Sequence, residues 1–458
     1  MIALLLAACS PDGASPRLPG VEVADTGDTA IGSVPGTSAR PPLTEPPEAV
    51  DLDADPAVLH VALTAAVATI DLDGVAVEAW TYEGTVPGPT LRAKIGDRLI
   101  VDLTNDLPAE TTIHWHGVHV PYAMDGVTWQ TAPIAAGASF TYDFVLDRAG
   151  TFWYHPHFDA DGQVDRGLYG LLVVEDPAEP LPDADLVWVF DVWGESSDDP
   201  DAQHGFTPLA GPWRVNGLVD PLLTLRGGDR VRARILNASN VGYLALSWPG
   251  LVRIGSDQGL LPAADAADEM LLAPGDRAVV ELLPGDETTA VTAASYTLAG
   301  PSIVGEPVEI MQVEADPPGP AGTPLDWPFS VAVPSVDPGT IDIVYVFAGD
   351  VHDGDWLING EQFPDVTIET LPLGSDAVIE VRNLSPTEHP FHLHGMPFEV
   401  LSVDGVPPST YLLEDTINVA IRQTVRLKLL ADNPGDWMAH CHILPHAHGG
   451  MMTVLRVE

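Results

Sequence analysis

A short pattern that recurs three times is the feature of this sequence that most constrains its fold. Each copy has a turn glycine followed nine residues later by an asparagine, with a strand-like segment between them. The three pairs are Gly96 and Asn105, Gly228 and Asn237, and Gly374 and Asn383. An earlier turn glycine in each copy (Gly84, Gly217 and Gly360) gives spacings of 133 and 143 residues. Each copy therefore has room for one β-sandwich of Greek-key type.

Alternation of apolar and polar residues indicates strands rather than helices. Leu99, Val101 and Leu103 alternate with the residues between them, as expected of a half-buried strand. The chain contains 42 Gly and 44 Pro, and no long segment shows a helical period. We therefore predict an all-β protein.

Three consecutive sandwiches of similar topology account for the length of 458 residues. We place the first at 51–178, the second at 184–318 and the third at 325–458. The proline-rich stretches 177–182 and 317–328 mark the boundaries between them.

The amino terminus has a different character. Residues 1–9 form a short apolar run that ends in Leu-Ala-Ala-Cys9, which resembles the end of a bacterial lipoprotein signal. No Lys or Arg precedes the run, and the alternative is a signal peptide that is removed together with an incidental Cys9. Residues 10–50 are rich in Pro, Gly, Ser and Thr and are expected to form a disordered tether. We expect an extracytoplasmic protein of the periplasm or cell envelope, attached to the membrane through a lipid on Cys9.

The charge balance excludes one class of partner. The chain has 19 Lys and Arg against 66 Asp and Glu, a net charge of −47. Such a surface repels a phosphate backbone, so nucleic-acid binding is disfavoured, and it attracts cations.

Four His-x-His pairs distinguish the first and third copies from the second. They are His114-Trp-His116, His155-Pro-His157, His392-Leu-His394 and His440-Cys-His442. On a strand, residues i and i+2 point to one face, so each pair can present both imidazoles together. The second copy has Leu246 where the others have the first histidine, and we expect it to be a spacer without metal. Imidazole suits copper, zinc, iron and nickel, so the pairs alone do not select the metal.

Cys441 narrows the choice of metal to copper for one of the sites. It lies inside the last His-x-His pair, with His389 upstream, His446 five residues later and Met451 ten residues later. One Cys, two His and a weak Met are the ligands of a blue copper site that transfers electrons.

With these motifs in family order, residues 51–458 resemble the multicopper oxidases, the laccase-like family of blue copper enzymes. The resemblance implies three cupredoxin-like domains and four copper ions. It assigns His389, Cys441, His446 and Met451 to the type 1 copper, His114 and His392 to the type 2 copper, and His116, His155, His157, His394, His440 and His442 to the type 3 pair. Because the pairs come from the first and third copies, the three-copper cluster is expected between those domains.

The resemblance also implies a reaction. A reductant gives single electrons to the type 1 copper, and four such events reduce dioxygen to two waters at the cluster. The family pattern places a proton-delivering acid where Asp125 stands. A second acid usually follows the last type 1 histidine, but Ala447 occupies that position, and His448 is the only candidate substitute we identify.

The electron donor is left open between two classes. The leading hypothesis is a laccase-type oxidase of phenols or aromatic amines, and the alternative is an oxidase of cuprous, ferrous or manganous ions in envelope copper homeostasis. A copper nitrite reductase lacks four His-x-His pairs, and a family member that had lost its copper would not keep the whole ligand set. The resemblance further implies a monomer.

Overall fold

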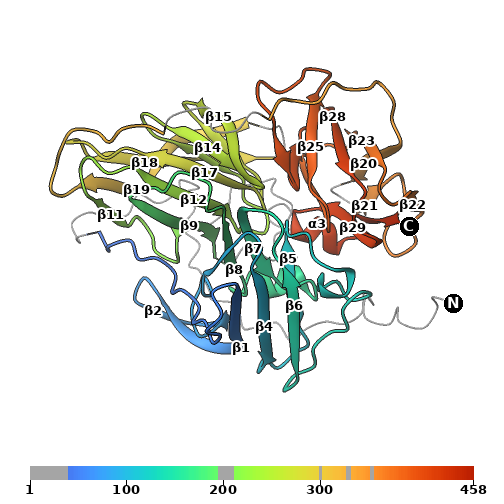
Figure 1. The fold of residues 1–458 in the computed structure, drawn as a ribbon, viewed down its shortest axis with the longest axis horizontal. Helices are drawn as coiled ribbons and strands as arrows, with labels where there is room; N and C mark the ends of the chain where they lie inside the picture. Colours follow the sequence, from blue (N-terminus) through green and yellow to red (C-terminus); the bar gives the residue numbers. More distant parts are fainter. Residues whose placement is uncertain (1–39, 194–210, 299–301, 326–331, 351–354) are drawn as a thin grey trace, which may run out of the picture. The chain divides into compact units, whose positions relative to one another are not determined.

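We analysed a computed structural model of the chain, which describes residues 40–193, 211–298, 302–325, 332–350 and 355–458. The described residues form six sheets, two for each of three sandwiches, and the predicted all-β class is confirmed. Figure 1 shows the strands coloured along the chain. No helix among the described residues is long and apolar enough to cross a membrane.

The first sandwich contains β1 to β8. One sheet has the order β2 (Val75–Tyr82), β1 (Val58–Leu72), β4 (Arg98–Asn105), β6 (Ser139–Val145), and the other β3 (Leu91–Lys94), β8 (Gly170–Glu175), β7 (Gly150–His155), β5 (His114–His116).

The second sandwich contains β9 to β19. One sheet has the order β10 (Trp213–Val215), β9 (Ala184–Val192), β12 (Val231–Asn237), β17 (Arg277–Leu282), β14 (Val252–Ser256), β15 (Gly259–Ala266), and the other β11 (Leu222–Leu225), β19 (Ser302–Ala315), β18 (Thr289–Thr297), β13 (Leu244–Ser247), β16 (Met270–Leu272).

The third sandwich contains β20 to β30. One sheet has the order β21 (Asp355–Ile358), β20 (Ile343–Asp350), β23 (Asp376–Asn383), β28 (Thr424–Leu430), β25 (Phe398–Val403), β26 (Leu413–Glu414), and the other β22 (Ile368–Leu371), β30 (Met452–Val457), β29 (Gly435–Cys441), β24 (His389–Leu393), β27 (Thr416–Val419). The described helices are short: η1 (Tyr122–Met124), α1 (Ala160–Val164) and α3 (Leu444–His448).

The three sandwiches share one topology. The first strand of each pairs in parallel with the strand that ends in the repeated asparagine: β1 with β4, β9 with β12, and β20 with β23. In the facing sheets, β3 with β8, β11 with β19, and β22 with β30 form the corresponding parallel pairs. The internal repeat in the sequence is therefore a repeat of the whole sandwich.

The repeated asparagines explain why that pattern recurs. Asn105, Asn237 and Asn383 are completely buried. In each, the side-chain amide donates to two backbone carbonyls at 2.7–2.9 Å, and Oδ1 accepts from the backbone N–H two residues later. Each asparagine thus satisfies buried backbone groups where a strand leaves the sheet, which an apolar side chain could not do.

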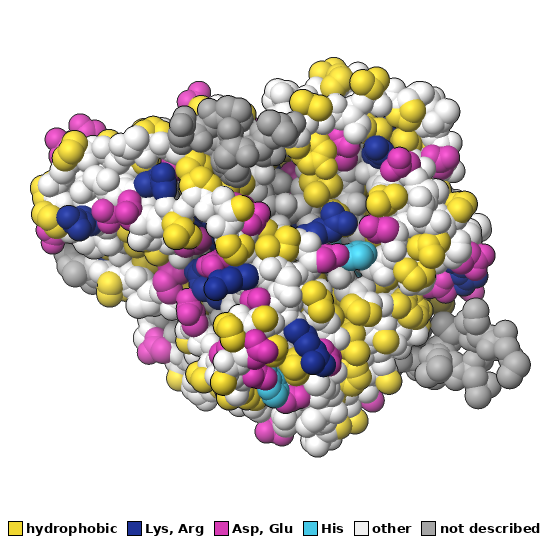
Figure 2. All heavy atoms as spheres, in the orientation of Figure 1, with side chains coloured by type: hydrophobic (Ala, Val, Ile, Leu, Met, Phe, Trp, Pro, Cys, Tyr) yellow, Lys and Arg dark blue, Asp and Glu magenta, His cyan; other side chains and the backbone are white. Residues whose placement is uncertain are grey.

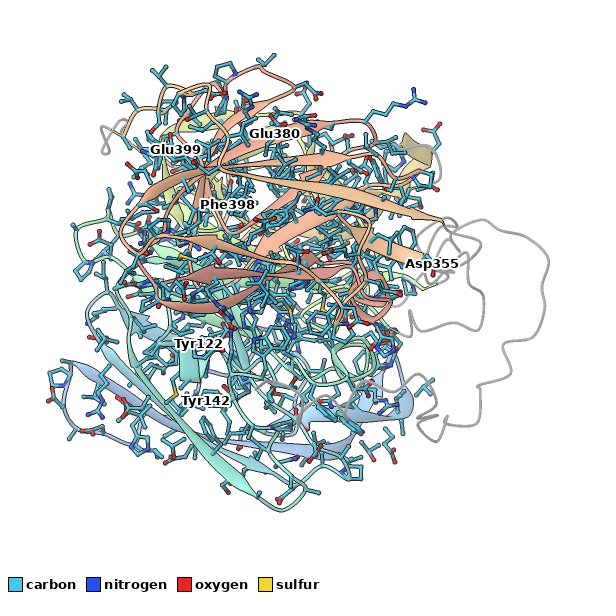
Figure 3. The ribbon with its side chains drawn as sticks, turned by 90° about the vertical axis from the view of Figure 1, so that its right-hand side faces the viewer. Tyr122, Tyr142, Asp355, Glu380, Phe398 and Glu399 are labelled. Atoms are coloured by element: carbon cyan, nitrogen blue, oxygen red, sulfur yellow. The ribbon has the colours of Figure 1, made fainter. Side chains whose placement is uncertain are left out.

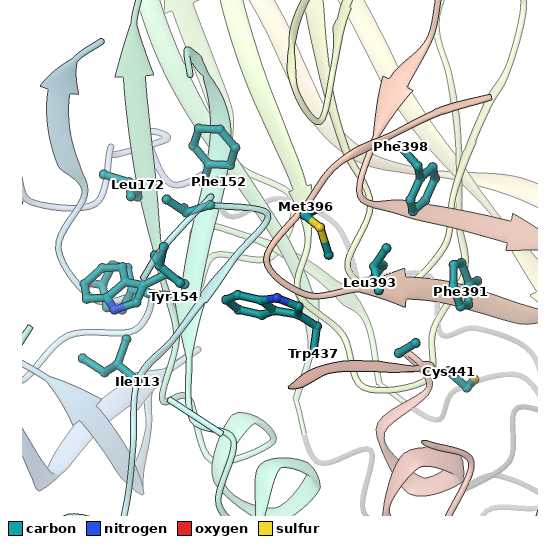
Figure 4. Close-up of a cluster of buried hydrophobic side chains, with 14 of the residues drawn as sticks. Ile113, Phe152, Tyr154, Leu172, Phe391, Leu393, Met396, Phe398, Trp437 and Cys441 are labelled. Carbon is teal, nitrogen blue, oxygen red and sulfur yellow. The ribbon is translucent and has the colours of Figure 1, made fainter. Parts of the chain in front are cut away.

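The apolar core is continuous between the first and third sandwiches. Ile113, Tyr154 and Leu172 of the first belong to one buried cluster with Leu393 and Trp437 of the third. Figure 4 shows these side chains on both sides of the junction. The two sandwiches are thereby packed as one body, which allows a single site to use residues from both.

The second sandwich has a core of its own. Leu246, which stands where the other copies have histidine, is buried in that core. That this sandwich holds no metal stays a prediction.

Residues 40–50 depart from our expectation. We predicted that the disordered tether extends to residue 50, but Pro42 bridges to Leu222 and Glu48 bridges to Thr90. Leu43 packs against the core of the second sandwich. This segment is extended and paired with two sandwiches, because proline-rich chain can add backbone hydrogen bonds at a sheet edge. Cys9, the predicted signal and residues 10–39 lie outside the described residues.

Candidate metal centre

Antiparallel strands bring the four His-x-His pairs together. In the first sandwich β5 lies beside β7, where His114 is the register partner of His155. In the third sandwich β24 lies beside β29 in the same way. Imidazoles of the two sandwiches stack on each other: His114 on His394 with ring centroids 3.8 Å apart, and His116 on His392 at 3.7 Å. The cluster is therefore built across the junction of the two sandwiches, as predicted.

Eight imidazoles form this cluster, seven of them buried and one half-buried. They are His114, His116, His155, His157, His392, His394, His440 and His442. Three triads have one nitrogen from each member within 4.8 Å of the others: His114, His116 and His155; His114, His392 and His394; His157, His394 and His440. The structure thus assembles all eight histidines that the sequence predicted for the three-copper cluster.

Many ring nitrogens of the cluster lack a hydrogen-bond partner among the described residues. They are Nε2 of His114, His155, His157 and His392, Nδ1 of His116, and both nitrogens of His442. Buried nitrogen atoms without partners are costly in a folded protein. A metal ion that accepts their lone pairs would satisfy them.

One contact inside the cluster shows the need for a cation directly. His394 Nδ1 lies 2.8 Å from a carboxylate oxygen of Asp125, and His440 Nδ1 lies 2.8 Å from the carbonyl of Cys441. Both Nδ1 atoms therefore carry protons, and the two Nε2 atoms, 3.2 Å apart, present lone pairs to each other. Burial lowers the pKa of His440 to about 4 and that of His394 well below the usual value, so both rings are neutral near pH 7.

A second site surrounds Cys441. Ser385 Oγ donates its one proton to Asn383 Oδ1 at 2.9 Å, and in that arrangement it accepts from His389 Nε2 at 2.6 Å. The free Nδ1 of His389 lies 3.4 Å from Cys441 Sγ and 3.2 Å from His446 Nδ1. Two imidazole nitrogens and one sulfur converge, and burial lowers the pKa of His389 to about 3.

The thiol of Cys441 and the position of Met451 complete this second site. Burial raises the pKa of the Cys441 thiol, so a thiolate there requires a compensating cation. Met451 is buried, its carbonyl accepts from Cys441 N at 3.1 Å, and its own N–H donates to His446 O at 3.0 Å. The residues that we predicted as a blue copper site are therefore neighbours in the fold.

The end of strand β29 connects the two sites. His440 and Cys441 are its last residues and His442 follows directly, and alternation places the thiol on one face and both imidazoles on the other. Cys441 belongs to the second site, and both histidines belong to the cluster. A single stretch of backbone therefore links the two donor sets.

Asp125 lies inside the cluster. Its side chain is completely buried and contacts His394, and its carbonyl accepts from His114 Nδ1 at 2.9 Å. One acidic residue thus contacts a histidine from each sandwich. Its role in proton delivery stays a prediction.

His448 is not brought to the cluster. Its side chain is 67% exposed at the end of α3 and lies 3.2 Å from Asp161. Ala447 is buried in α3 and offers no acid. The geometry gives no support to our suggestion that His448 replaces the acid missing at Ala447.

Sequence reasoning missed two residues of the cluster. Asp415 Oδ1 lies 3.0 Å from His116 Nε2, and the Thr416 hydroxyl lies 2.9 Å from the same nitrogen. The Asp415 carbonyl also accepts from His392 Nδ1 at 2.9 Å. Neither residue lies in a histidine motif, and Asp415 is one of 66 acidic residues, so no local signal marked it.

Comparison with known proteins agrees with this geometry. Two family models, both described as multicopper oxidase, match residues 64–179 and 335–458. These ranges contain the strands that carry the histidines.

Similar proteins cover most of the chain. Multicopper oxidase MmcO of Mycobacterium tuberculosis is 30% identical over 452 residues, which cover 86% of this chain and 86% of that protein. A multicopper oxidase of Campylobacter jejuni, described as a metallo-oxidase, has a TM-score of 0.81 and 27% identity, covering 92% of this chain and 96% of its own. A laccase of Pediococcus acidilactici has a TM-score of 0.80 and 25% identity, covering 95% and 96%.

Proposed function

The chain belongs to the multicopper oxidase family, and on that premise we propose that it oxidises a one-electron donor beside Cys441 and reduces dioxygen to water at the histidine cluster. The observation that carries this proposal is the set of buried imidazole nitrogens without partners, together with the buried thiol. Cations would satisfy the imidazole nitrogens and would compensate a thiolate at Cys441, and the end of β29 contributes residues to both sites.

We assign the donor set to four copper ions. The type 1 copper takes His389, Cys441, His446 and Met451; the type 2 copper takes His114 and His392; the type 3 pair takes His116, His155, His157, His394, His440 and His442. When bound, copper supplies the one-electron redox chemistry that imidazole, thiol and carboxylate groups lack.

The protein's own groups prepare both sites for that chemistry. A hydrogen bond from one ring nitrogen leaves the other nitrogen with a lone pair for a metal ion. Ser385 has this effect on His389, and Asp125 has it on His394. Burial of almost all the ligand side chains excludes bulk water. Asp125 is the buried carboxylate positioned to hold a proton near the cluster, and it reaches His394 directly.

The surroundings of His446 favour an aromatic donor. Trp356 is buried and stacks on His446, with ring centroids 3.7 Å apart. Trp129 and Phe363 are both half-buried, with ring centroids 5.3 Å apart and planes tilted by 31°, and Phe363 N–H donates to the carbonyl of Gly450 at 3.0 Å. We name Trp129 and Phe363 the aromatic pair. A planar phenol or aromatic amine can stack on this pair close to the type 1 ligands.

One neighbouring carboxylate is already occupied. Glu388, which precedes His389, is buried and accepts hydrogen bonds from Tyr296 and Asn418. Both of its carboxylate oxygens already have a hydrogen-bond partner, so it is not an unsatisfied ligand waiting for a metal ion, which supports the laccase-type assignment.

The alternative donor is a cuprous, ferrous or manganous ion. The net charge of −47 favours it, because an acidic surface raises the local concentration of cations. Figure 2 shows acidic side chains distributed over the visible face among hydrophobic ones. One similar protein is described as a metallo-oxidase, so the experiment below also includes metal ions as electron donors.

The experiment compares oxygen uptake with a phenol, Cu(I) and Fe(II) in the copper-loaded protein and in Phe363→Ala. The variant should lower kcat/KM for the phenol about threefold to tenfold, the range expected for loss of an aromatic contact, and leave that for Fe(II) within about twofold. Phe140→Ala, at a half-buried phenylalanine in β6 of the first sandwich, is the matched control.

Two outcomes would contradict the proposal. A wild-type kcat/KM for a metal ion far above that for any phenol or aromatic amine would select the metal-ion oxidase. An equal loss with all three donors in Phe363→Ala would show that the aromatic pair is not a donor contact.

A further inference from the structure

The second sandwich has no histidine in the cluster, but its Arg277, Asp257 and Gln258 contact Asp415 beside it. Arg277 begins β17, and its side chain is completely buried. Its guanidinium donates to both carboxylate oxygens of Asp415, one of them at 2.7 Å, and its Nε donates to the carbonyl of Thr151 in β7 at 2.8 Å. A residue of the second sandwich is therefore hydrogen-bonded to the first and the third.

Asp415, which Arg277 holds in place, in turn contacts two histidines of the cluster. Its carboxylate contacts His116 of the first sandwich, and its carbonyl accepts from His392 of the third. These two rings lie almost parallel, 9° apart, with centroids at 3.7 Å. An ionised carboxylate only accepts hydrogen bonds, so this contact places the proton of His116 on Nε2. The Nδ1 atom of His116 then has a free lone pair that can bind a metal ion.

The backbone around Asp415 is also held from the second sandwich. Asp257 Oδ2 accepts from the N–H groups of Asp415 and Thr416 at 3.3 and 3.2 Å, and its other oxygen accepts from Arg277 N at 3.0 Å. Glu414 accepts from Asp257 N at 3.0 Å. The carboxylates of Asp257 and Asp415 share the single positive charge of Arg277. Its planar guanidinium also makes a two-point contact with Asp415, which a lysine ammonium could not make.

Packing leaves little freedom for this arrangement to shift. A Cβ at Gly117 would overlap the Asp415 carboxylate and would lie 2.7 Å from Arg277 Nη2. A Cβ at Gly275, two residues before Arg277, would lie 2.9 Å from the ring of His442. The second sandwich thus contacts His442 of the cluster directly at Gly275 and contacts Asp415 through Arg277.

From these contacts we propose that Arg277 is a positioning residue of the metal cluster, acting through Asp415 to orient His116 and His392. The second sandwich is on this account a structural component of the metal centre and not the spacer expected from the sequence. The inference rests on the proposed function, because it assigns Arg277 a task in holding copper ligands.

The test compares wild type, Arg277→Met and Arg277→Lys, all loaded with the same copper(II) salt. We measure copper bound per chain, copper retention against a chelator, and the type 1 and type 2 signals in electron paramagnetic resonance. Arg277→Met should retain the blue type 1 signal and hold cluster copper about 10–100-fold more weakly. Arg277→Lys keeps the charge without the two-point contact and should show an altered type 2 signal.

Arg232→Met is the matched control. Arg232 is also buried in the second sandwich, on β12, and pairs with Glu179 at 3.0 Å and Asp185 at 3.5 Å. Neither acid contacts a histidine of the cluster in the described part of the chain. This variant removes a buried arginine and should leave copper content and the type 2 signal unchanged.

The outcomes separate this inference from the proposed function. Wild type without type 1 and type 2 signals would contradict the proposed function itself. A normal wild type with unchanged retention and type 2 signal in Arg277→Met would overturn the positioning role. If Arg277→Met does not fold, Arg277→Lys decides, and a type 2 signal identical to that of wild type would overturn the inference. Equal losses in Arg232→Met would show that any buried arginine of this sandwich has the same effect.

Discussion

Several imidazoles of the site have the nitrogen that can bind a metal selected by the hydrogen bond that the other nitrogen makes. Asp125 accepts from His394, Ser385 accepts from His389, and the Asp415 carbonyl accepts from His392. Backbone carbonyls and side-chain oxygens thus set the tautomers before any metal arrives. Preorganisation of this kind lowers the reorganisation needed when copper binds.

A pH dependence of stability follows from the buried histidines. Burial lowers the pKa of His389 to about 3 and that of His440 to about 4, from about 6.5 in an unfolded chain. Between the pKa in the folded protein and the pKa of 6.5 in the unfolded chain, the unfolded state binds more protons. The free energy of unfolding that these histidines contribute above pH 6.5 is therefore lost as the pH falls toward 4.

We expect buried His440 to lower the stability of the copper-free protein between pH 7 and pH 4, by up to about 1.4 kcal/mol per pH unit. Asp191 and Asp276 act in the opposite direction, because burial raises the pKa of each to about 7. Differential scanning calorimetry of wild type and His440→Gln in matched buffers therefore isolates the contribution of the histidine. The same dependence of Tm on pH in both proteins would be inconsistent with a neutral buried imidazole at His440.

Met451 carries a separate prediction about the type 1 site. Met451→Leu should raise the reduction potential of that site, because a weak axial ligand that stabilises the oxidised metal is lost. Redox titration of the blue absorption measures it. Met396→Leu is the control, since Met396 is buried in the shared core and was not predicted as a ligand. Equal potentials in wild type and Met451→Leu would argue against axial Met451.

At the level of strands and turns, the three repeated asparagines form hydrogen bonds with backbone groups at the ends of equivalent strands. Their predicted importance follows from hydrogen bonding alone, since each satisfies two carbonyls in a buried position. The second sandwich is a suitable place to test this, because its asparagine is not followed by a histidine pair in the sequence.

Asn237→Ala should lower the free energy of unfolding by about 2–5 kcal/mol, because two buried carbonyls lose their donor. Chemical denaturation followed by intrinsic fluorescence measures the change. Copper content of the folded fraction should stay at the wild-type value. A loss below about 0.5 kcal/mol would show that water replaces the amide without cost.

Elements also show why part of the site could be predicted from sequence and part could not. The His-x-His pairs and the glycine-to-asparagine spacing are local patterns, so the amino-acid sequence alone is enough to place β5 and β24. Asp415 and Arg277 meet across 138 residues. That contact depends on how two sandwiches pack, which no local pattern encodes. Figure 3 shows Tyr142, whose hydroxyl accepts from the N–H of Ile113 at 2.7 Å and supports β5 in a similar non-local way.

For the whole molecule, the predicted fold and the observed fold agree in class and in the number of sandwiches. The main differences concern parts that sequence reasoning treated as passive. Residues 40–50 pack against two sandwiches, and Arg277 links the second sandwich to the cluster. Composition predicted a tether for the first because Pro-rich segments bury little apolar surface, but backbone pairing at sheet edges does not depend on composition.

Attachment to a membrane remains our proposal for the whole chain. Cys9 lies outside the described residues, and the apolar run before it resembles a lipoprotein signal. In a bacterial host that lipidates such signals, the wild type should fractionate with membranes and Cys9→Ser should not, with equal oxidase activity in both. Soluble wild-type protein in that host would contradict the proposal.

We propose that this single chain holds a type 1 copper at Cys441 and a three-copper cluster between its first and third sandwiches. Copper analysis of the purified, copper-loaded protein tests this, together with visible and electron paramagnetic resonance spectra of wild type and Cys441→Ser. We expect four copper ions per chain with type 1 and type 2 signals in wild type, and loss of the blue type 1 signal with retention of the type 2 signal in the variant. A colourless wild-type protein, or one whose spectrum Cys441→Ser leaves unchanged, would contradict it.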